Sequence, residues 1–169
     1  MPRLTTFERA AFLAEPGVLM HISVVRADGS PLVTPLWFVH EHDHIYFTPR
    51  ARSEWYNCLK RDPRIALSID EQPLPYRKVV IEGNAELVFD LGADAKWRDQ
   101  YLRIAQRYVP SAAATAYIHT TIDQPRALFR VPMNGSKVRG WRMPVGNEPG
   151  DGIWHQRCYA PGSKLKQST

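Results

Sequence analysis

The chain has 169 residues with 44% hydrophobic and 23% charged residues and a net charge of +5, values that are ordinary for one globular domain with its own core. No apolar run approaches the roughly 20 residues of a membrane-spanning helix, and the N-terminus lacks the apolar core of a signal peptide, so we expect a cytoplasmic protein and no membrane partner. The basic residues after Arg126 alternate with apolar ones and form no dense run, so we do not expect nucleic acid as a partner either.

The first predicted element is a helix from about Thr6 to Glu15. Thr5 and Glu8 have the spacing of a capping box, and Pro16-Gly17 ends the helix. Alternating apolar residues then predict a strand from Val18 to Arg26, and the turn at Asp28-Gly29 predicts a hairpin to a return strand that begins at Pro31.

The stretch from Leu32 to Arg64 is central to the functional prediction. The apolar runs 32–39 and 45–48, joined by polar residues, predict a hairpin. Pro35 lies inside the first run, so that strand must be an edge strand or carry a bulge. The basic loop 49–53 follows, and its arginine forks and hydroxyls suit the oxygens of a phosphate. We therefore hypothesise that a phosphorylated cofactor binds here.

The remaining elements are a helix over 53–62, strands over 64–70 and 77–89, a helix over 93–108, a short alanine-rich helix from Ser111, and strands over 126–131 and 137–141. Gly83 inside a strand predicts a bulge or bend, as at the corner of a small barrel. Residues 1–141 are expected to form one domain. The Gly/Pro-rich residues 142–169, which include Trp154 and Tyr159, are expected to be a tail docked on the barrel or on a partner subunit.

Metal and thiol chemistry find little support. His40, His42 and His44 alternate as metal ligands on a strand could, but Glu41 and Asp43 indicate a solvated turn, so no metal site is predicted. No Gly-rich phosphate loop is present. Cys58 and Cys158 are too few for a disulfide framework, and we expect two free thiols.

An ordered series of short motifs resembles a known family. It comprises Asp28-Gly29-Ser30-Pro31, Thr34-Pro35-Leu36-Trp37-Phe38, Ile45-Tyr46-Phe47-Thr48, the run from Asn57 to Arg64 and Glu82-Gly83. The series resembles the pyridoxamine 5′-phosphate oxidase-like, FMN-binding split-barrel superfamily, well over Phe12 to Phe89 and weakly beyond.

The resemblance implies a mainly β fold, a six-stranded antiparallel, Greek-key-like split barrel with peripheral helices. It also implies a homodimer that binds FMN in a groove between subunits. The residues it assigns to the cofactor are Thr34, Pro35, Leu36, Trp37, Thr48, Pro49, Arg50, Arg52, Ser53 and Trp141.

One position departs from the family pattern. Many relatives have a phosphate-binding cation eight residues before the proline of Asp62-Pro63, where this chain has Trp55. Arg50 and Arg52 stand earlier. Either the loop bends so that they take over, or the cofactor differs, or the site is degenerate. Trp55 could stack on a ring or belong to the core.

The implied function is a flavin-dependent oxidoreductase acting on a small organic substrate. A flavin carries the redox chemistry itself, so no catalytic residue is assigned. Three alternatives stay open: a reductase that uses the deazaflavin coenzyme on the same fold, a non-catalytic protein that binds flavin, haem or a pyridoxal-type ligand, and a basic nucleic-acid-binding barrel.

Overall fold

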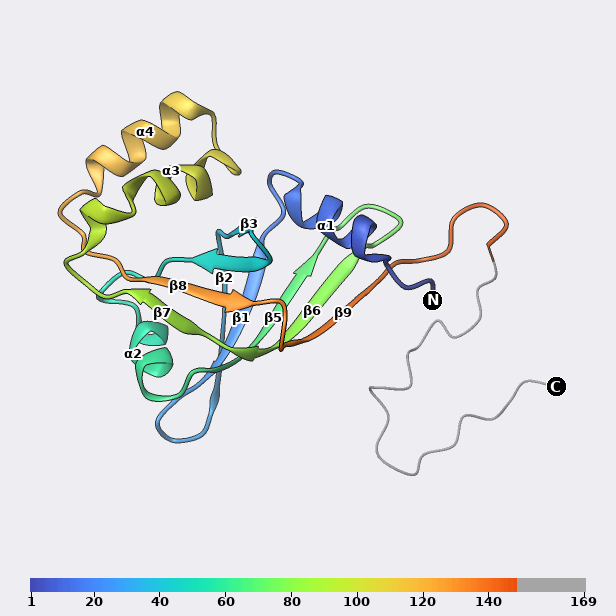
Figure 1. Cartoon of the computed structure of the whole chain (residues 1–169), viewed down its shortest axis with the longest axis horizontal. Helices are drawn as coiled ribbons and strands as arrows, with labels where there is room; N and C mark the ends of the chain where they lie inside the picture. The colour runs from blue at the N-terminus through green and yellow to red at the C-terminus, as the bar shows by residue number, and fades with distance from the viewer. Residues whose placement is uncertain (149–169) are drawn as a thin grey trace.

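The computed structural model describes residues 1–148, in which two antiparallel sheets pack together and helices lie around them (Figure 1). The five-stranded sheet has the order β2-β1-β5-β6-β9, with bounds Pro31–Leu36, Met20–Val25, Arg64–Asp70, Lys78–Asn84 and Lys137–Trp141. The four-stranded sheet has the order β3-β4-β8-β7, with bounds Val39–Glu41, His44–Phe47, Leu128–Pro132 and Glu86–Phe89. The prediction of a mainly β fold is confirmed.

The helices are α1 (Thr6–Ala14), α2 (Glu54–Arg61), α3 (Arg98–Gln106) and α4 (Ser111–Thr120), and a 3₁₀ turn, η1 (Asp94–Lys96), precedes α3. α1 contacts β3, α2 contacts β1, and α3 packs on α4. Figure 1 shows the α3–α4 pair at one end of the four-stranded sheet, beyond β3 and β8.

Helix α1 begins as its sequence predicts. The Glu8 amide donates to Thr5 Oγ1 at 3.2 Å, and the Thr5 amide donates to Glu8 Oε2 at 2.8 Å, which completes the capping box. At the other end, the Arg107 guanidinium donates to the Leu13 carbonyl at 2.8 Å and to the Glu15 carbonyl. These bonds attach the end of α1 to the chain just after α3.

Alternation along the strands builds the core. Every second residue of β1 and β5 is buried, and within the four-stranded sheet Phe47 of β4 stacks on its cross-strand partner Phe129 of β8, with ring centroids 6.0 Å apart. Tyr56 of α2 meets Phe129 edge-on at 6.3 Å. Phe129 therefore joins both partners to one apolar cluster.

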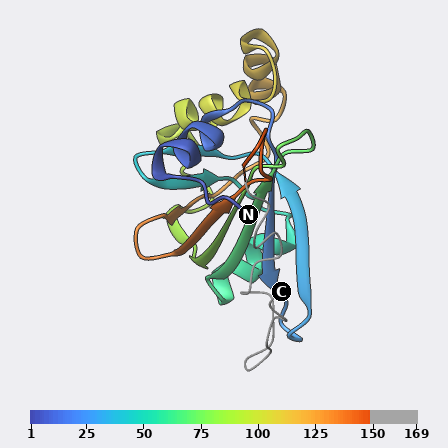
Figure 2. The ribbon, with the colours of Figure 1, turned by 90° about the vertical axis from the view of Figure 1, so that its right-hand side faces the viewer.

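The predicted hairpin between 32–39 and 45–48 is confirmed at its turn, where Val39 pairs with Tyr46, but residues 32–36 do not pair with 45–48. β2 pairs with β1 across the predicted Asp28-Gly29 turn, with Thr34 opposite Ile22, and the chain then crosses between the sheets at Trp37 and Phe38. β3 forms the hairpin with β4, through a turn in which His42 and Asp43 have positive φ. Residues 32–39 are apolar apart from Thr34, so composition did not reveal the crossing at Trp37 and Phe38. β2 is an edge strand, which agrees with the prediction from Pro35, and Figure 2 shows it (light blue) on the outside of the sheet.

The predicted strand over 77–89 also divides between the sheets, after Asn84, so that the described residues contain nine strands. Gly83 lies inside β6, just before this corner. A Cβ added there would lie 2.3 Å from Ser136 Oγ, in the loop before β9. Gly83 is therefore needed because another segment approaches it closely.

We expect Gly83→Ala to destabilise the protein by about 1–3 kcal/mol, the usual effect of forcing extra volume into a packed site. Urea denaturation of Gly83→Ala in the wild-type and Ser136→Gly backgrounds measures this. The cost should fall in the Ser136→Gly background, which lacks the clashing hydroxyl. An equal cost in both would place the strain elsewhere.

The first residues of the predicted tail contact the rest of the chain. The Arg142 amide donates to the Pro2 carbonyl at 3.1 Å, and the Met143 amide donates to the Pro75 carbonyl at 2.7 Å.

Cys58 is a buried free thiol in α2. Cys158, Trp154, Tyr159 and the rest of 149–169 lie outside the described residues. Up to residue 148, none of the helices has both the length and the apolar character that crossing a membrane requires.

Candidate functional site

A cavity of about 280 Å³ lies where the β2–β3 crossing, the loop after β4 and the α3–α4 pair meet. Its lining contains six of the ten residues that the sequence assigned to a cofactor: Pro35, Leu36, Trp37, Thr48, Arg50 and Ser53. The others in the lining are Trp55, Tyr101, Ile104, Tyr117 and Arg126. The structure thus gathers most of the predicted set at one place.

Backbone pairing holds the basic loop against the start of β8. The Ala51 amide donates to the Pro125 carbonyl at 2.9 Å, and the Ala127 amide donates to the Pro49 carbonyl at 3.1 Å. Between them, Arg50 and Arg126 form an antiparallel bridge. This pairing places two cations that are far apart in sequence side by side.

Aromatic side chains form one wall of the cavity. The Trp37 ring stacks on Tyr108, with centroids 5.0 Å apart and an interplanar angle of 2°. Tyr117 of α4 meets Trp37 edge-on at 5.6 Å. The Tyr108 hydroxyl donates to the Val18 carbonyl at 2.9 Å and accepts from the Phe38 amide at 3.2 Å. These contacts fix Trp37 as a preformed apolar surface beside the cavity.

Arg126 is the functional candidate that the sequence analysis missed. Its side chain is buried, with 6% relative exposure. The guanidinium donates to the Tyr117 hydroxyl at 3.0 Å, reaches Thr48 Oγ1 at 3.5 Å and lies over the Tyr101 ring at 4.5 Å. Among residues 1–148, no carboxylate forms an ion pair with it, and its Nε has no hydrogen-bond partner.

An unneutralised buried cation is costly, because burial removes its hydration without supplying an opposite charge. Such an arrangement is typical of a site that receives an anion from outside the chain. Only the position of Arg126 at the start of an apolar strand hinted at this role, and nothing in the sequence showed that α3 and α4 would cover it.

Tyr117 lies between the two arginines. Arg50 Nη2 and Arg126 Nη2 each donate to its hydroxyl oxygen at 3.0 Å. Burial raises the pKa of Tyr117. The Tyr101 hydroxyl and the positive charges of Arg126 and Arg50 lower it by more than burial raises it, so the pKa lies below the ordinary 10.0. The phenol oxygen is thus an acceptor that the two guanidiniums use within the chain.

We expect Tyr117 to ionise at lower pH than an ordinary tyrosine, because the neighbouring cations favour the phenolate. One component of the near-ultraviolet tyrosinate absorbance should therefore have its midpoint below pH 10.0. Tyr117→Phe should remove this early phase, whereas Tyr76→Phe, a control at a 42% exposed tyrosine, should keep it. An early phase that survives in Tyr117→Phe would contradict the assignment.

Two hydroxyl groups complete the polar side of the cavity. Ser53 is the N-cap residue of α2, but its side chain makes no capping hydrogen bond. It and Thr48 are therefore available to donate to an anion beside Arg50. Thr34 and Pro49 flank the lining residues but do not belong to it.

Arg52 lies in a neighbouring cavity of about 480 Å³, lined also by Arg50, Ala51, Asp123, Gln124 and Pro125. Arg50 belongs to both cavities and so marks their junction. Trp55 lines the first cavity, but it also packs against the core and lies 6.0 Å from the Phe47 ring. It thus packs on the core, one of the two alternatives from the sequence, and it also borders the cavity.

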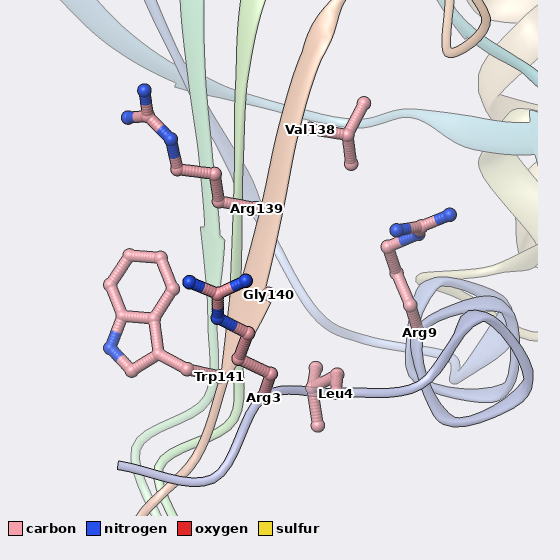
Figure 3. Close-up of a pocket in the computed structure, with 7 residues that line it drawn as sticks. All are labelled: Arg3, Leu4, Arg9, Val138, Arg139, Gly140 and Trp141. Atoms are coloured by element: carbon pink, nitrogen blue, oxygen red, sulfur yellow. The ribbon is translucent and has the colours of Figure 1, made fainter.

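Trp141 lies elsewhere. It belongs to β9, at the edge of the five-stranded sheet opposite to β2, and lines a third cavity with Arg3, Leu4 and Arg9 (Figure 3). Within one subunit it therefore does not line the first cavity, the one of about 280 Å³ beside Trp37, which is called the Trp37 cavity below. In the described part of the chain, no three His, Cys, Asp or Glu side chains are grouped as a metal site would require.

Comparison with known proteins identifies the family and the fold. A sequence model described as pyridoxamine 5′-phosphate oxidase matches residues 6–129. No curated protein matches the chain by sequence. A conserved hypothetical protein from Mycobacterium tuberculosis superposes with a TM-score of 0.63 at 20% identity, over 88% of this chain and 94% of its own.

Two further solved structures carry functional descriptions. HutZ, described as a haem storage protein from Vibrio cholerae, has a TM-score of 0.59 at 18% identity, over 79% of this chain and 94% of its own. A protein described as an F420 reductase has a TM-score of 0.53 at 24% identity, over 78% of this chain and 91% of its own. At these identities, the similarity shows a common fold.

Proposed function

The chain belongs to the pyridoxamine 5′-phosphate oxidase family, and from this premise we propose that it is an FMN-binding oxidoreductase acting on a small organic substrate. The observation that carries the proposal is Arg126, a buried guanidinium in a cavity whose lining contains no acidic residue. A phosphate group would supply the missing negative charge.

The residues present fit FMN at both ends. Arg126, Arg50, Thr48 and Ser53 would hold the phosphate, since guanidinium forks and hydroxyls match its oxygens. Leu36, Trp37 and Ile104 offer an apolar wall to the ring system. The bound flavin supplies the redox chemistry. The chain's own side chains bind and orient it and exclude water, and Tyr117 is the titratable hydroxyl beside it.

A homodimer is part of the proposal. Trp141 and the Trp37 cavity lie toward opposite edges of the five-stranded sheet. Only a second copy could bring a Trp141 to the flavin of the first, as the family resemblance implies. Light scattering with and without FMN tests this, because a dimer-interface site requires dimers whenever FMN is bound. We also propose that the protein acts in the cytoplasm.

Titration of the flavin-free protein with FMN tests the function. We expect saturable quenching of flavin fluorescence at one FMN per subunit, followed by reduction of the bound flavin by a chemical reductant and reoxidation by an acceptor. Absence of quenching, with a Soret band on addition of haem, would replace the proposal with a haem-binding function.

The second cavity favours one alternative cofactor. Because Arg52 lies beyond Arg50, a cofactor with a longer anionic tail than FMN, such as the deazaflavin coenzyme, would extend from the first cavity into the second. Arg52→Gln should then weaken binding of the deazaflavin coenzyme and leave FMN binding unchanged. Equal effects on both cofactors would argue against this extension.

A further inference from the structure

A small cavity adjoins the Trp37 cavity, and Tyr101 and Arg126 line both. The rest of its lining comes from η1 and the start of α3, including Asp94 and Trp97, and from the end of α4 with the residues that follow it. The volume of the small cavity is about 10 Å³. This is about one water-sized sphere, so the cavity has room for a single heavy atom and not for a phosphate or another polyatomic anion.

Buried polar atoms without a hydrogen-bond partner are concentrated at this cavity. Residues 1–148 contain five such side-chain atoms, and three of them belong to lining residues: Trp97 Nε1, Tyr101 Oη and Arg126 Nε. The three residues have 5%, 7% and 6% relative exposure, so they have little contact with bulk water. The Tyr101 hydroxyl lies near those of Tyr117 and Thr121, but no group is in hydrogen-bonding geometry with it. Buried polar groups normally have partners, so this cluster requires an explanation.

The unpartnered groups are donors. The two Nη atoms of Arg126 bond to Thr48 and Tyr117, which line the Trp37 cavity or contact it, and the Nε–H is left over. Trp97 lines the small cavity and not the Trp37 cavity. An indole N–H and a guanidinium N–H can only donate, and a tyrosine hydroxyl can also donate. The cavity is therefore suited to a ligand that accepts hydrogen bonds.

The lining also carries a net positive charge. It contains the arginines Arg98 and Arg126 and one carboxylate, Asp94. Asp94 Oδ1 accepts a hydrogen bond from the Arg126 backbone amide at 2.7 Å. Within residues 1–148, neither arginine has a carboxylate at ion-pair distance. An anion in the cavity would supply the charge that the buried guanidinium lacks.

We propose that this cavity binds one halide ion, such as chloride, which accepts hydrogen bonds from Trp97 Nε1, Tyr101 Oη and Arg126 Nε. A halide is the anion that matches both the single-atom volume and the positive charge of the lining. A water molecule would fill the same space but would leave the charge of Arg126 unneutralised. The proposal concerns the flavin-free protein and does not rest on the flavin assignment, because Trp97 and the Nε–H of Arg126 are not used to bind the phosphate.

The indole N–H resonance of Trp97 in the flavin-free, full-length protein tests the proposal. Chloride replaces gluconate at constant ionic strength, and Trp97→Phe assigns the resonance by removing one of the five tryptophans. We expect a saturable shift of this resonance. In Arg126→Met the chloride affinity should fall by at least about tenfold, because a charge-assisted hydrogen bond is lost. Arg130→Met removes a cation from β8 outside the small cavity and should leave the affinity unchanged. A linear shift, or no shift as expected of a site that holds only water, would overturn the proposal.

Thermal unfolding of the flavin-free protein gives a second readout. The Tm should rise by about 3–6 °C for each tenfold increase in chloride above the Kd, because a ligand that binds only the folded state stabilises it by RT ln 10 per decade. Trp97→Phe should lose most of this chloride dependence. Trp55→Phe changes a residue that lines the Trp37 cavity and not the small one, and it should keep the dependence. An undiminished chloride dependence in Trp97→Phe would overturn the assignment of the halide to this cavity.

Discussion

Replacing Arg126 with methionine is expected to weaken FMN binding by about 100-fold, because the variant loses charge-assisted hydrogen bonds that each contribute roughly 1.5–3 kcal/mol. The flavin-free variant should nevertheless be at least as stable as the wild type. Arg126 is buried without an ion-pair partner among the described residues, so methionine removes an unneutralised charge and keeps the packing against Tyr101.

These two results together separate a ligand-binding role for Arg126 from a structural role. Fluorescence titration with FMN measures the first, and urea denaturation of the flavin-free protein measures the second. A structural arginine would show the reverse pattern, with lost stability and unchanged FMN affinity in whatever fraction remains folded.

Arg130→Met is the matched control for this substitution. Arg130 belongs to β8 and is paired with Glu86 of β7 at 2.7 Å, outside the Trp37 cavity. We expect unchanged FMN affinity in this variant. The pair is partly exposed, so its loss should cost little stability.

Phe129→Ala is expected to lower the free energy of unfolding by about 3–5 kcal/mol, the usual range for removing a buried phenyl ring. Phe129 has 2% relative exposure and contacts both Phe47 and Tyr56, so its loss opens a cavity between the four-stranded sheet and α2. Few of these neighbours can close that cavity, because they are held by their own strands and helix.

Urea denaturation monitored by circular dichroism measures this effect, and Phe7→Ala provides the control. Phe7 is 83% exposed on α1, so the same chemical change there should alter stability by no more than about 0.5 kcal/mol. Comparable losses in both variants would mean that the contacts of Phe129 with Phe47 and Tyr56 do not hold α2 against the four-stranded sheet.

Local patterns predicted most of the elements. The capping box of Thr5 and Glu8, the alternation over 64–70 and the run 137–141 gave α1, β5 and β9 almost to the residue. The pairing of the strands was harder. The residues of 32–39 have the composition of one strand. They divide at Trp37 because the first part pairs with β1 in one sheet and the part from Val39 pairs with β4 in the other. Residues 77–89 divide after Asn84 for the same reason, since β6 pairs with β5 and β9 whereas β7 pairs with β8.

The candidate site shows the same division. The motifs around Pro35, Thr48 and Arg50 lie on consecutive elements and could be read from the sequence, because the crossing after β2 and the turn after β4 bring them to one cavity. Arg126 and Tyr117 could not be assigned, since their role depends on backbone pairing with residues 49–51 and on the packing of α4.

By itself, then, the sequence determined the family, the strand-rich fold and the basic loop, because alternation, turn residues and short motifs are local properties of the chain. Only the tertiary structure decided where charge is buried. Whether a guanidinium is neutralised depends on what surrounds it in space, and the surroundings of Arg126 come from the loop after β4, from α3 and from α4, segments that the sequence places up to 78 residues away.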